Sequence, residues 1–125
     1  MTMLDTWWKS LPDPEQKRPW GEYEILLDDD KVKVKRIRVK PNKRLSYQYH
    51  HKRSEAWTIT EGVGTITLNG ETSDYISGQT ILIPQGTKHR IENKTNNKII
   101  FIEVQTGSYF GEDDIVRIED DYNRE

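Results

Sequence analysis

The chain has 125 residues, with 21 acidic and 19 basic side chains, a formal net charge of −2 and no cysteine. This length suits one domain with a single core, and the absence of cysteine excludes disulfides, thiolate metal ligands and a cysteine nucleophile. The charge balance argues against nucleic acid as the main partner. No apolar run approaches the roughly 20 residues that span a bilayer, and residues 1–13 lack a secretory pattern, so we expect a cytoplasmic protein with no membrane contact.

The first 17 residues differ in pattern from the rest of the chain. Trp7 and Trp8 stand between polar residues and are followed by Pro12 and Pro14. This segment is expected to form a short arm or helix whose tryptophans dock on the domain or on a second copy of the chain. The pattern predicts an N-terminal arm at 1–17, a barrel domain at 18–125, and a homodimer.

From Trp20 onward the pattern is that of short strands separated by Gly, Pro, Asn and Asp. Strands are expected at 22–27, 32–39, 45–50, 56–60, 64–68, 74–76, 80–83, 89–92 and 98–105. Asn69-Gly70 is a strong signal for a tight hairpin. Short antiparallel strands must close or double up to cover their edges, which predicts an all-β, single-domain barrel or jelly roll. The acidic segment 111–125 is expected to lie over one mouth, extended or as a short helix.

Two charged stretches have ordinary interpretations. Residues 31–44 contain eight basic side chains, and the lysines at 31, 33 and 35 alternate with valines, as on the solvated face of a strand. The apolar alternation through Val34 and Ile37 has one break in phase. The run Glu112-Asp113-Asp114 is interpreted as a solvated acidic stretch, with fixing Arg117 over the bore as the alternative.

The histidines point to metal chemistry. Gln48 and His50 are two positions apart on an expected strand, so their side chains share a face. A bend after His50 would return the Glu55 carboxylate to that face, and His89 opens a later strand. His51 faces away from His50. Two imidazoles, a carboxylate and an amide oxygen suit a borderline divalent ion. We expect one such ion per chain, bound by Gln48, His50, Glu55 and His89.

These clusters resemble the paired motifs of the cupin superfamily. The second motif, G-x5-P-x-G-x2-H-x3-N, is matched at every defined position, namely Gly78, Pro84, Gly86, His89 and Asn93. The first motif, G-x5-H-x-H-x4-E-x6-G, is matched at His50, Glu55 and Gly62. Asn42 replaces its opening glycine, and asparagine also accepts positive φ. Gln48 replaces its first histidine. The resemblance implies the cupin fold, a double-stranded β-helix.

A narrower resemblance covers nearly the whole chain. The chain is similar to the C-terminal cupin domain of type II phosphomannose isomerases, which is often fused to a mannose-1-phosphate guanylyltransferase domain. The segments that carry this resemblance are 18–23, 45–50, 53–57, 84–90, 103–107, 111–117 and 121–124. In that family a Gln-x-His pair supplies metal ligands, which fits Gln48. Three positions depart from the family pattern: Lys52 and Ala56 replace histidines, and Asn123 replaces glycine.

The resemblance implies the interconversion of mannose 6-phosphate and fructose 6-phosphate through a cis-enediol, in a pathway that supplies mannose for polysaccharide synthesis. The metal, zinc by expectation with manganese, iron, cobalt or nickel as alternatives, would act as a Lewis acid. Arg53 and Arg117 are the expected catalytic cations. Glu103 is the candidate base, with Glu61 or a metal-bound water as alternatives. Because cationic side chains grip phosphate, the candidate substrate-binding residues are Arg90, Lys88, Lys52 and Arg124.

Two other classes of function stay open at this stage. A sugar-binding or regulatory cupin would keep the metal without turnover, and Lys52 and Ala56 favour this alternative. A metal-dependent dioxygenase or epimerase would use the same barrel, but oxygen chemistry requires redox-active iron or copper.

Overall fold

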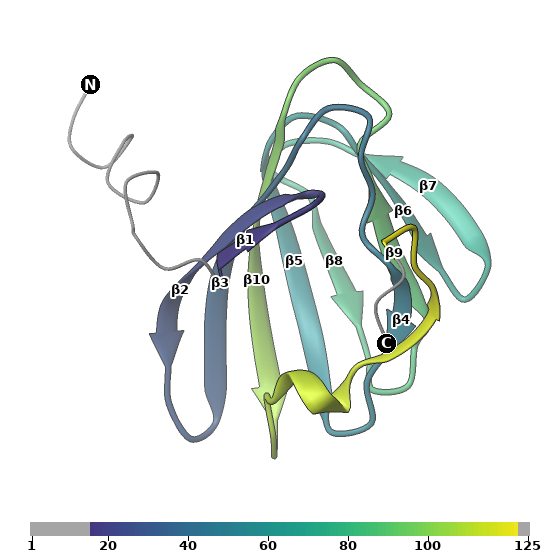
Figure 1. The fold of residues 1–125 in the computed structure, drawn as a ribbon. Helices are drawn as coiled ribbons and strands as arrows, with labels where there is room; N and C mark the ends of the chain where they lie inside the picture. Colours follow the sequence, from purple (N-terminus) through teal and green to yellow (C-terminus); the bar gives the residue numbers. More distant parts are fainter. Residues whose placement is uncertain (1–15, 123–125) are drawn as a thin grey trace.

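Two antiparallel sheets face each other in the computed structural model, which describes residues 16–122 (Figure 1). The six-stranded sheet has the order β1-β2-β3-β10-β5-β8, and the five-stranded sheet has the order β11-β4-β9-β6-β7. The strands of the first sheet are β1 (Lys17–Arg18), β2 (Gly21–Asp28), β3 (Val32–Val39), β10 (Ile99–Gly107), β5 (Arg53–Glu61) and β8 (Thr80–Ile83). Those of the second are β11 (Val116–Glu119), β4 (Tyr47–Tyr49), β9 (His89–Glu92), β6 (Gly64–Leu68) and β7 (Glu71–Tyr75).

The all-β prediction is confirmed, and each of the nine expected strands has a counterpart. The sequence pattern missed β1 and β11, which are short edge strands. The acidic C-terminal segment contributes both a 3-10 helix, η3 (Glu112–Asp114), and β11, which pairs with β4. The predicted N-terminal arm lies outside the described residues apart from its last two positions. The described part of the chain contains no helix with the length and apolarity needed to cross a bilayer.

Two turn predictions are confirmed by the backbone. Asn69 and Gly70 have φ values of 47° and 85°, and they close the hairpin in which Leu68 of β6 pairs with Glu71 of β7. Positive φ at both central positions is the requirement of a tight hairpin turn. Asn42, at the position of the glycine that opens the first cupin motif, has φ of 59°. Asparagine tolerates this region better than other non-glycine residues.

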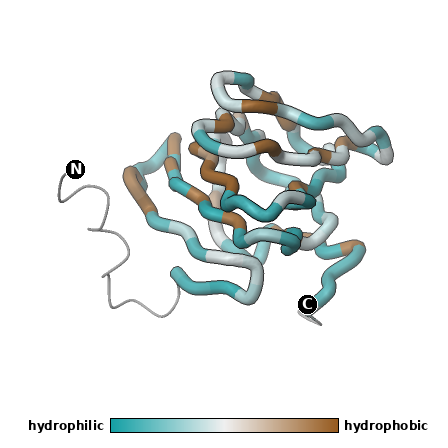
Figure 2. The backbone as a smooth tube through the Cα atoms, turned by 90° about the horizontal axis from the view of Figure 1, so that it is seen from above, coloured by the Kyte–Doolittle hydropathy of each residue, from teal (hydrophilic) through white to brown (hydrophobic). Residues whose placement is uncertain are grey.

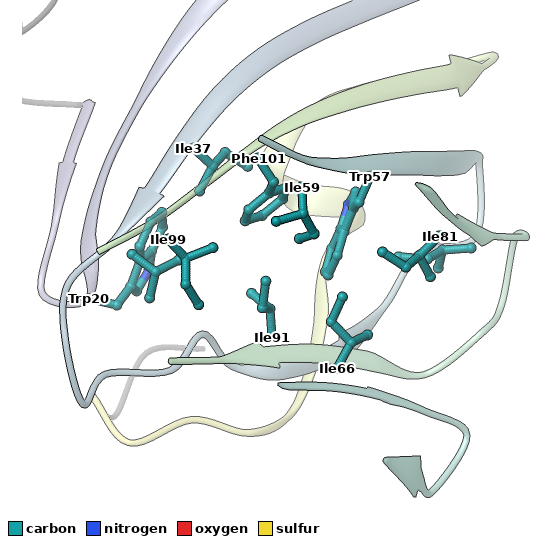
Figure 3. Close-up of a cluster of buried hydrophobic side chains, with 11 residues drawn as sticks. Trp20, Ile37, Trp57, Ile59, Ile66, Ile81, Ile91, Ile99 and Phe101 are labelled. Atoms are coloured by element: carbon teal, nitrogen blue, oxygen red, sulfur yellow. The ribbon is translucent and has the colours of Figure 1, made fainter. Parts of the chain in front are cut away.

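The apolar core lies between the two sheets. Along the tube in Figure 2, brown and teal stretches alternate within the strands, as expected where one face of a strand is buried. Figure 3 shows Ile66 and Ile91 of the five-stranded sheet pointing toward Ile59 and Trp57 of the six-stranded sheet. These side chains are almost completely buried, so the contact between the sheets holds the barrel together.

The inward faces of the two longest strands, β5 and β10, change character halfway along their length. On β10 the buried residues run from Ile99 and Phe101 to Glu103 and Gln105. The antiparallel register places Phe101 beside Ile37 of β3 and Glu103 beside Lys35. One half of the interior is therefore an apolar core and the other half is a polar cavity. This division positions the candidate site.

Candidate metal centre

Three side chains that are far apart in the sequence converge in the polar half of the barrel interior. His50 follows β4, Glu55 lies in β5 and His89 opens β9. Each offers one ligand atom, and these atoms lie within 4.8 Å of one another. The Nε2 of His50 is 3.2 Å from Oε2 of Glu55, and the Nε2 of His89 is 3.7 Å from its Oε1. All three residues are buried.

Main-chain carbonyls fix the orientation of both imidazoles. Nδ1 of His50 lies 3.2 Å from the carbonyl oxygen of Asp114, and Nδ1 of His89 lies 2.8 Å from that of Thr87. A carbonyl only accepts a hydrogen bond, so both Nδ1 atoms carry a proton, and both Nε2 atoms face Glu55. Nη2 of Arg53, a donor, lies 3.3 Å from Nε2 of His50, in agreement with this tautomer. Such outer contacts are typical of metal-binding histidines.

The charge states suit a cation. Burial alone would raise the pKa of Glu55, but its contact with His50 and the charge of the Arg53 guanidinium hold that pKa well below its usual value. Burial lowers the pKa of His89, which keeps its imidazole neutral and able to ligate. The carboxylate of Glu55 is held by Nε of Arg53 at 2.8 Å and by Nε1 of Trp57 at 2.9 Å.

Gln48 lies beside one of these three residues in the sheet. It is the register partner of His89 across the β4–β9 pair, and it lines the same cavity as the other three residues. Two imidazole nitrogens, one carboxylate and one amide oxygen fit a borderline divalent ion. His50, Glu55, His89 and Gln48 are therefore the residues that would hold such an ion in this chain.

Glu103 is the second acid inside the cavity. Its Oε2 accepts a hydrogen bond from Nε1 of Trp57 at 3.1 Å, and its Oε1 accepts one from Nε2 of Gln105 at 2.7 Å. Burial and the nearby charge of Glu55 raise the pKa of Glu103 to about 8. Two carboxyl groups in one cavity thus have opposite pKa shifts, a pattern that often separates a charged group from a proton carrier.

The cavity is lined by cations as well as by the candidate ligands. Of the cations predicted from sequence, Arg53 and Arg117 lie in its wall. Arg18 and Lys35, which the sequence analysis did not assign to a site, lie there too. The solvated strand face predicted for the lysines at 31, 33 and 35 is wrong at Lys35, which is buried. The break in the apolar alternation could have indicated this burial, because Lys35 lies two positions before the inward-facing Ile37 and so shares its side of the strand.

The other predicted substrate-binding residues lie elsewhere. Arg90 is buried outside the cavity, where its Nε donates to the carbonyl of Leu45 and its Nη1 to Glu119. Lys88 and Lys52 are exposed, and Lys52 stacks over the ring of Tyr109. These three do not line the cavity. Arg124 lies outside the described residues.

Lys52 and Ala56, the two positions where the family has histidines, are also outside the cavity, and the third departure, Asn123, lies outside the described residues. Side chains alternate along β5, so Ala56 faces away from the buried Glu55 and Trp57. Ala56 instead lines a shallow groove with Leu82 and Val104 on the outer side of the six-stranded sheet. Neither Lys52 nor Ala56 therefore removes a functional group from the candidate site.

The C-terminal segment closes one side of the cavity. Glu112 and Arg117 from this segment lie in the cavity wall. The solvated interpretation of the acidic run is wrong at Asp114, which is buried. Burial opposes its charge, but the backbone N–H groups of Lys52 and His51 donate to its two carboxylate oxygens at 2.9 and 3.1 Å and hold its pKa below the usual value.

A two-sheet barrel with a His/Glu/His cluster in its bore defines this chain as a cupin domain of the double-stranded β-helix type. The match of residues 12–120 to the model of the family "Mannose-6-phosphate isomerase C-terminal" is more specific. The chain belongs to this family.

Curated relatives share this domain but are much longer. The chain is 44% identical over 110 residues to the mannose-1-phosphate guanylyltransferase ManC of Salmonella typhimurium, covering 88% of the chain and 23% of the relative. It is 45% identical over 107 residues to the xanthan biosynthesis protein XanB of Xanthomonas campestris, covering 86% and 23%. The chain thus spans about a quarter of the length of the relatives it matches.

Solved structures with lower identity share the fold. A Klebsiella pneumoniae protein with a double-stranded β-helix domain superposes with a TM-score of 0.72 at 19% identity, over 84% of this chain and 92% of that one. The capsular polysaccharide assembling protein CapF of Staphylococcus aureus superposes with a TM-score of 0.71 at 23% identity, over 82% and 33%.

Proposed function

We propose that this chain is a metal-dependent mannose-6-phosphate isomerase that interconverts mannose 6-phosphate and fructose 6-phosphate. The observation that carries the proposal is the convergence of His50, Glu55 and His89 in a cavity that also holds Glu103 and several cations. Membership of the mannose-6-phosphate isomerase C-terminal family supports it. We propose zinc as the ion and Gln48 as its fourth ligand.

The reaction moves one proton between adjacent carbons. The hydrogen on C2 of the open-chain aldose is removed as a proton while the C1 carbonyl oxygen gains a proton, which gives the cis-enediol. Protonation of C1 and loss of the proton on the C2 oxygen then give the ketose. A bound divalent ion supplies Lewis-acid polarisation of the two sugar oxygens. The chain must supply a proton carrier at the carbons and an anchor for the phosphate.

Glu103 is the proposed proton carrier because of its position. It projects into the cavity from β10, one strand away from Glu55 on β5, and Trp57 donates to both carboxyl groups. Trp57 and Gln105 hold the Glu103 carboxyl at a fixed angle. A general acid–base group must be positioned at the atom it protonates. Arg117, which lines the cavity, is proposed to stabilise the negative charge that develops on the enediol oxygens, and Arg53 is proposed to act there through the Glu55 carboxylate that it holds.

The non-catalytic alternative rested on Lys52 and Ala56. Both residues lie outside the cavity, so neither substitution takes a side chain out of the proposed site. A dioxygenase or epimerase would need a different metal or substrate, and metal analysis separates it from the isomerase. The homodimer and the cytoplasmic location stay predictions.

A coupled assay tests the proposal. Formation of fructose 6-phosphate from mannose 6-phosphate is followed through a dehydrogenase couple, with the purified chain as isolated, after chelation, and after return of zinc, manganese, cobalt, nickel or iron. Turnover should disappear with chelator and with Glu55→Gln, and should persist in His51→Ala, whose ring lies at the surface. Absence of turnover with every metal would contradict the isomerase. Binding of mannose 6-phosphate without turnover would favour the sugar-binding module.

A further inference from the structure

Two buried cations in the cavity wall, Lys35 and Arg53, have the same half-exposed carboxylate, that of Glu112, as a neighbour. The side chains of Lys35 and Arg53 are 7% and 4% exposed, whereas that of Glu112 is 51% exposed. A single oxygen, Oε2 of Glu112, lies 4.0 Å from Nζ of Lys35 and 3.8 Å from Nη1 of Arg53. Both distances exceed that of a hydrogen bond. The carboxylate thus stands between the two cations without bonding to either.

Arg53 has one donor with no hydrogen-bond partner among the described residues. Its Nε donates to Glu55 and its Nη2 contacts His50, so these two nitrogens face the candidate metal ligands. Its Nη1 is buried and makes no hydrogen bond to another described residue. A buried charged donor without a partner is costly, and such a group in a cavity wall is a candidate for ligand binding.

Within residues 16–122, Lys35 is held in place by an aromatic ring and not by a hydrogen bond to an acid. Its Nζ lies 4.6 Å from the centre of the Tyr23 ring, a cation–π contact that leaves the ammonium donors available. Four cationic and three carboxylate side chains line the cavity, and one of the three carboxylates is the half-exposed Glu112. This part of the cavity wall is therefore a cationic site. Its anionic neighbour, Glu112, is easily displaced because it is half-exposed and forms no hydrogen bond to either cation.

We propose that Lys35 and Arg53 form the subsite for the phosphate group of the substrate, and that Glu112 occupies this subsite until the phosphate displaces it. This inference rests on the proposed function, since that function supplies a sugar phosphate as the ligand. A phosphate monoester carries more charge and more acceptor oxygens than a carboxylate, so it satisfies both cations at hydrogen-bond distance. Glu112 acts as an internal competitor that weakens the binding of the substrate.

The test measures binding of inorganic phosphate by isothermal titration calorimetry, with the full chain as purified and again after treatment with chelator. Lys35→Met should weaken phosphate binding about tenfold or more, the loss expected when a charged hydrogen-bond donor is removed. Glu112→Gln should tighten it about two- to fivefold, the effect of removing one partly exposed ion-pair partner. A gain in affinity cannot arise from misfolding, and circular dichroism checks the fold of the lysine variant.

Matched controls come from neighbouring residues outside the subsite. Lys88→Met removes an exposed lysine, and Asp113→Asn removes the charge next to Glu112, where the side chain contacts Tyr109. Both should bind phosphate as the parent chain does. Unchanged affinity in Lys35→Met or Glu112→Gln would overturn the subsite, and so would binding that is lost on chelation in every variant alike. Isomerase turnover with an unchanged KM for mannose 6-phosphate in both variants would overturn the subsite and leave the proposed function standing.

Discussion

Nδ1 of His50 donates to the main-chain carbonyl of Asp114 at 3.2 Å, although 64 positions separate the two residues in the chain. The carboxylate of Asp114 in turn accepts from the backbone N–H groups of His51 and Lys52. The C-terminal segment is thereby fastened to the connection between β4 and β5, and it orients one of the candidate metal ligands. Asp114, which the sequence pattern assigned to solvent, thus helps to orient a candidate metal ligand.

Replacing Asp114 should weaken both stability and metal binding. Asp114→Ala removes the acceptor of two backbone donors, which should lower the free energy of unfolding by about 1–3 kcal/mol. It also loosens the carbonyl that orients His50, so metal affinity should fall about 10- to 100-fold. Urea unfolding and competition with a chromophoric chelator measure the two effects. Asp113→Ala is the control, and equal losses in both variants would contradict the special role of Asp114.

The metal-free protein should lose stability as the pH rises toward 8. The pKa of Glu103 is raised to about 8 in the fold by burial and by Glu55, while in the unfolded chain it returns to the ordinary value. Between these values the folded state binds the proton and the unfolded state does not, so the free energy of unfolding decreases with increasing pH and levels off above about 8. Urea unfolding of chelated protein from pH 5 to 9 measures this slope.

Two substitutions identify the source of that slope. Glu103→Gln should flatten the dependence, because its amide does not titrate. Glu61→Gln, at an exposed carboxylate paired with Lys98, should leave the slope as in the parent chain. The decisive range lies above the ordinary histidine pKa, because the lowered pKa of His89 gives a slope of opposite sign below it. A parent chain with equal stability on the two sides of the Glu103 pKa of about 8 would contradict the protonated state assigned to Glu103.

Loss of one imidazole should abolish stoichiometric metal. His50→Ala and His89→Ala each remove a donor from a cluster whose ligand atoms lie within 4.8 Å of one another. A ligand that binds the folded state alone raises its stability, so chelator should lower the melting temperature of the parent chain and leave both variants unchanged. Plasma mass spectrometry counts the bound ion. His51→Ala should keep it, and metal retained in both alanine variants would refute the centre.

Restoring the two family histidines should change little. Lys52→His and Ala56→His alter side chains outside the cavity, and surface substitutions usually shift stability by less than about 0.5 kcal/mol. Metal affinity and any turnover should stay within about twofold of the parent chain. Calorimetry and the coupled isomerase assay make the comparison. A large gain in turnover with either histidine would show that the departures matter after all.

The sequence by itself determined the fold class and the three residues of the candidate metal site. Short alternating runs and an Asn-Gly turn are local signals, because side chains alternate across a strand and only a few residues accept positive φ. His50, Glu55 and His89 were identified by residue type and spacing, and their convergence follows from the barrel that those local signals predict. Asn42, at the position of a motif glycine, adopts the positive φ expected of it.

Tertiary structure alone decided which charges face the interior. Lys35 and Asp114 resemble surface residues in the sequence, yet both are buried. The register with β10 places Lys35 opposite Glu103, and contacts across more than 60 positions bury Asp114. The same long-range pairing leaves Arg90 and Lys88 outside the cavity. A charged side chain carries no local signal of its partner, since the partner is chosen by strand register and by packing between distant segments.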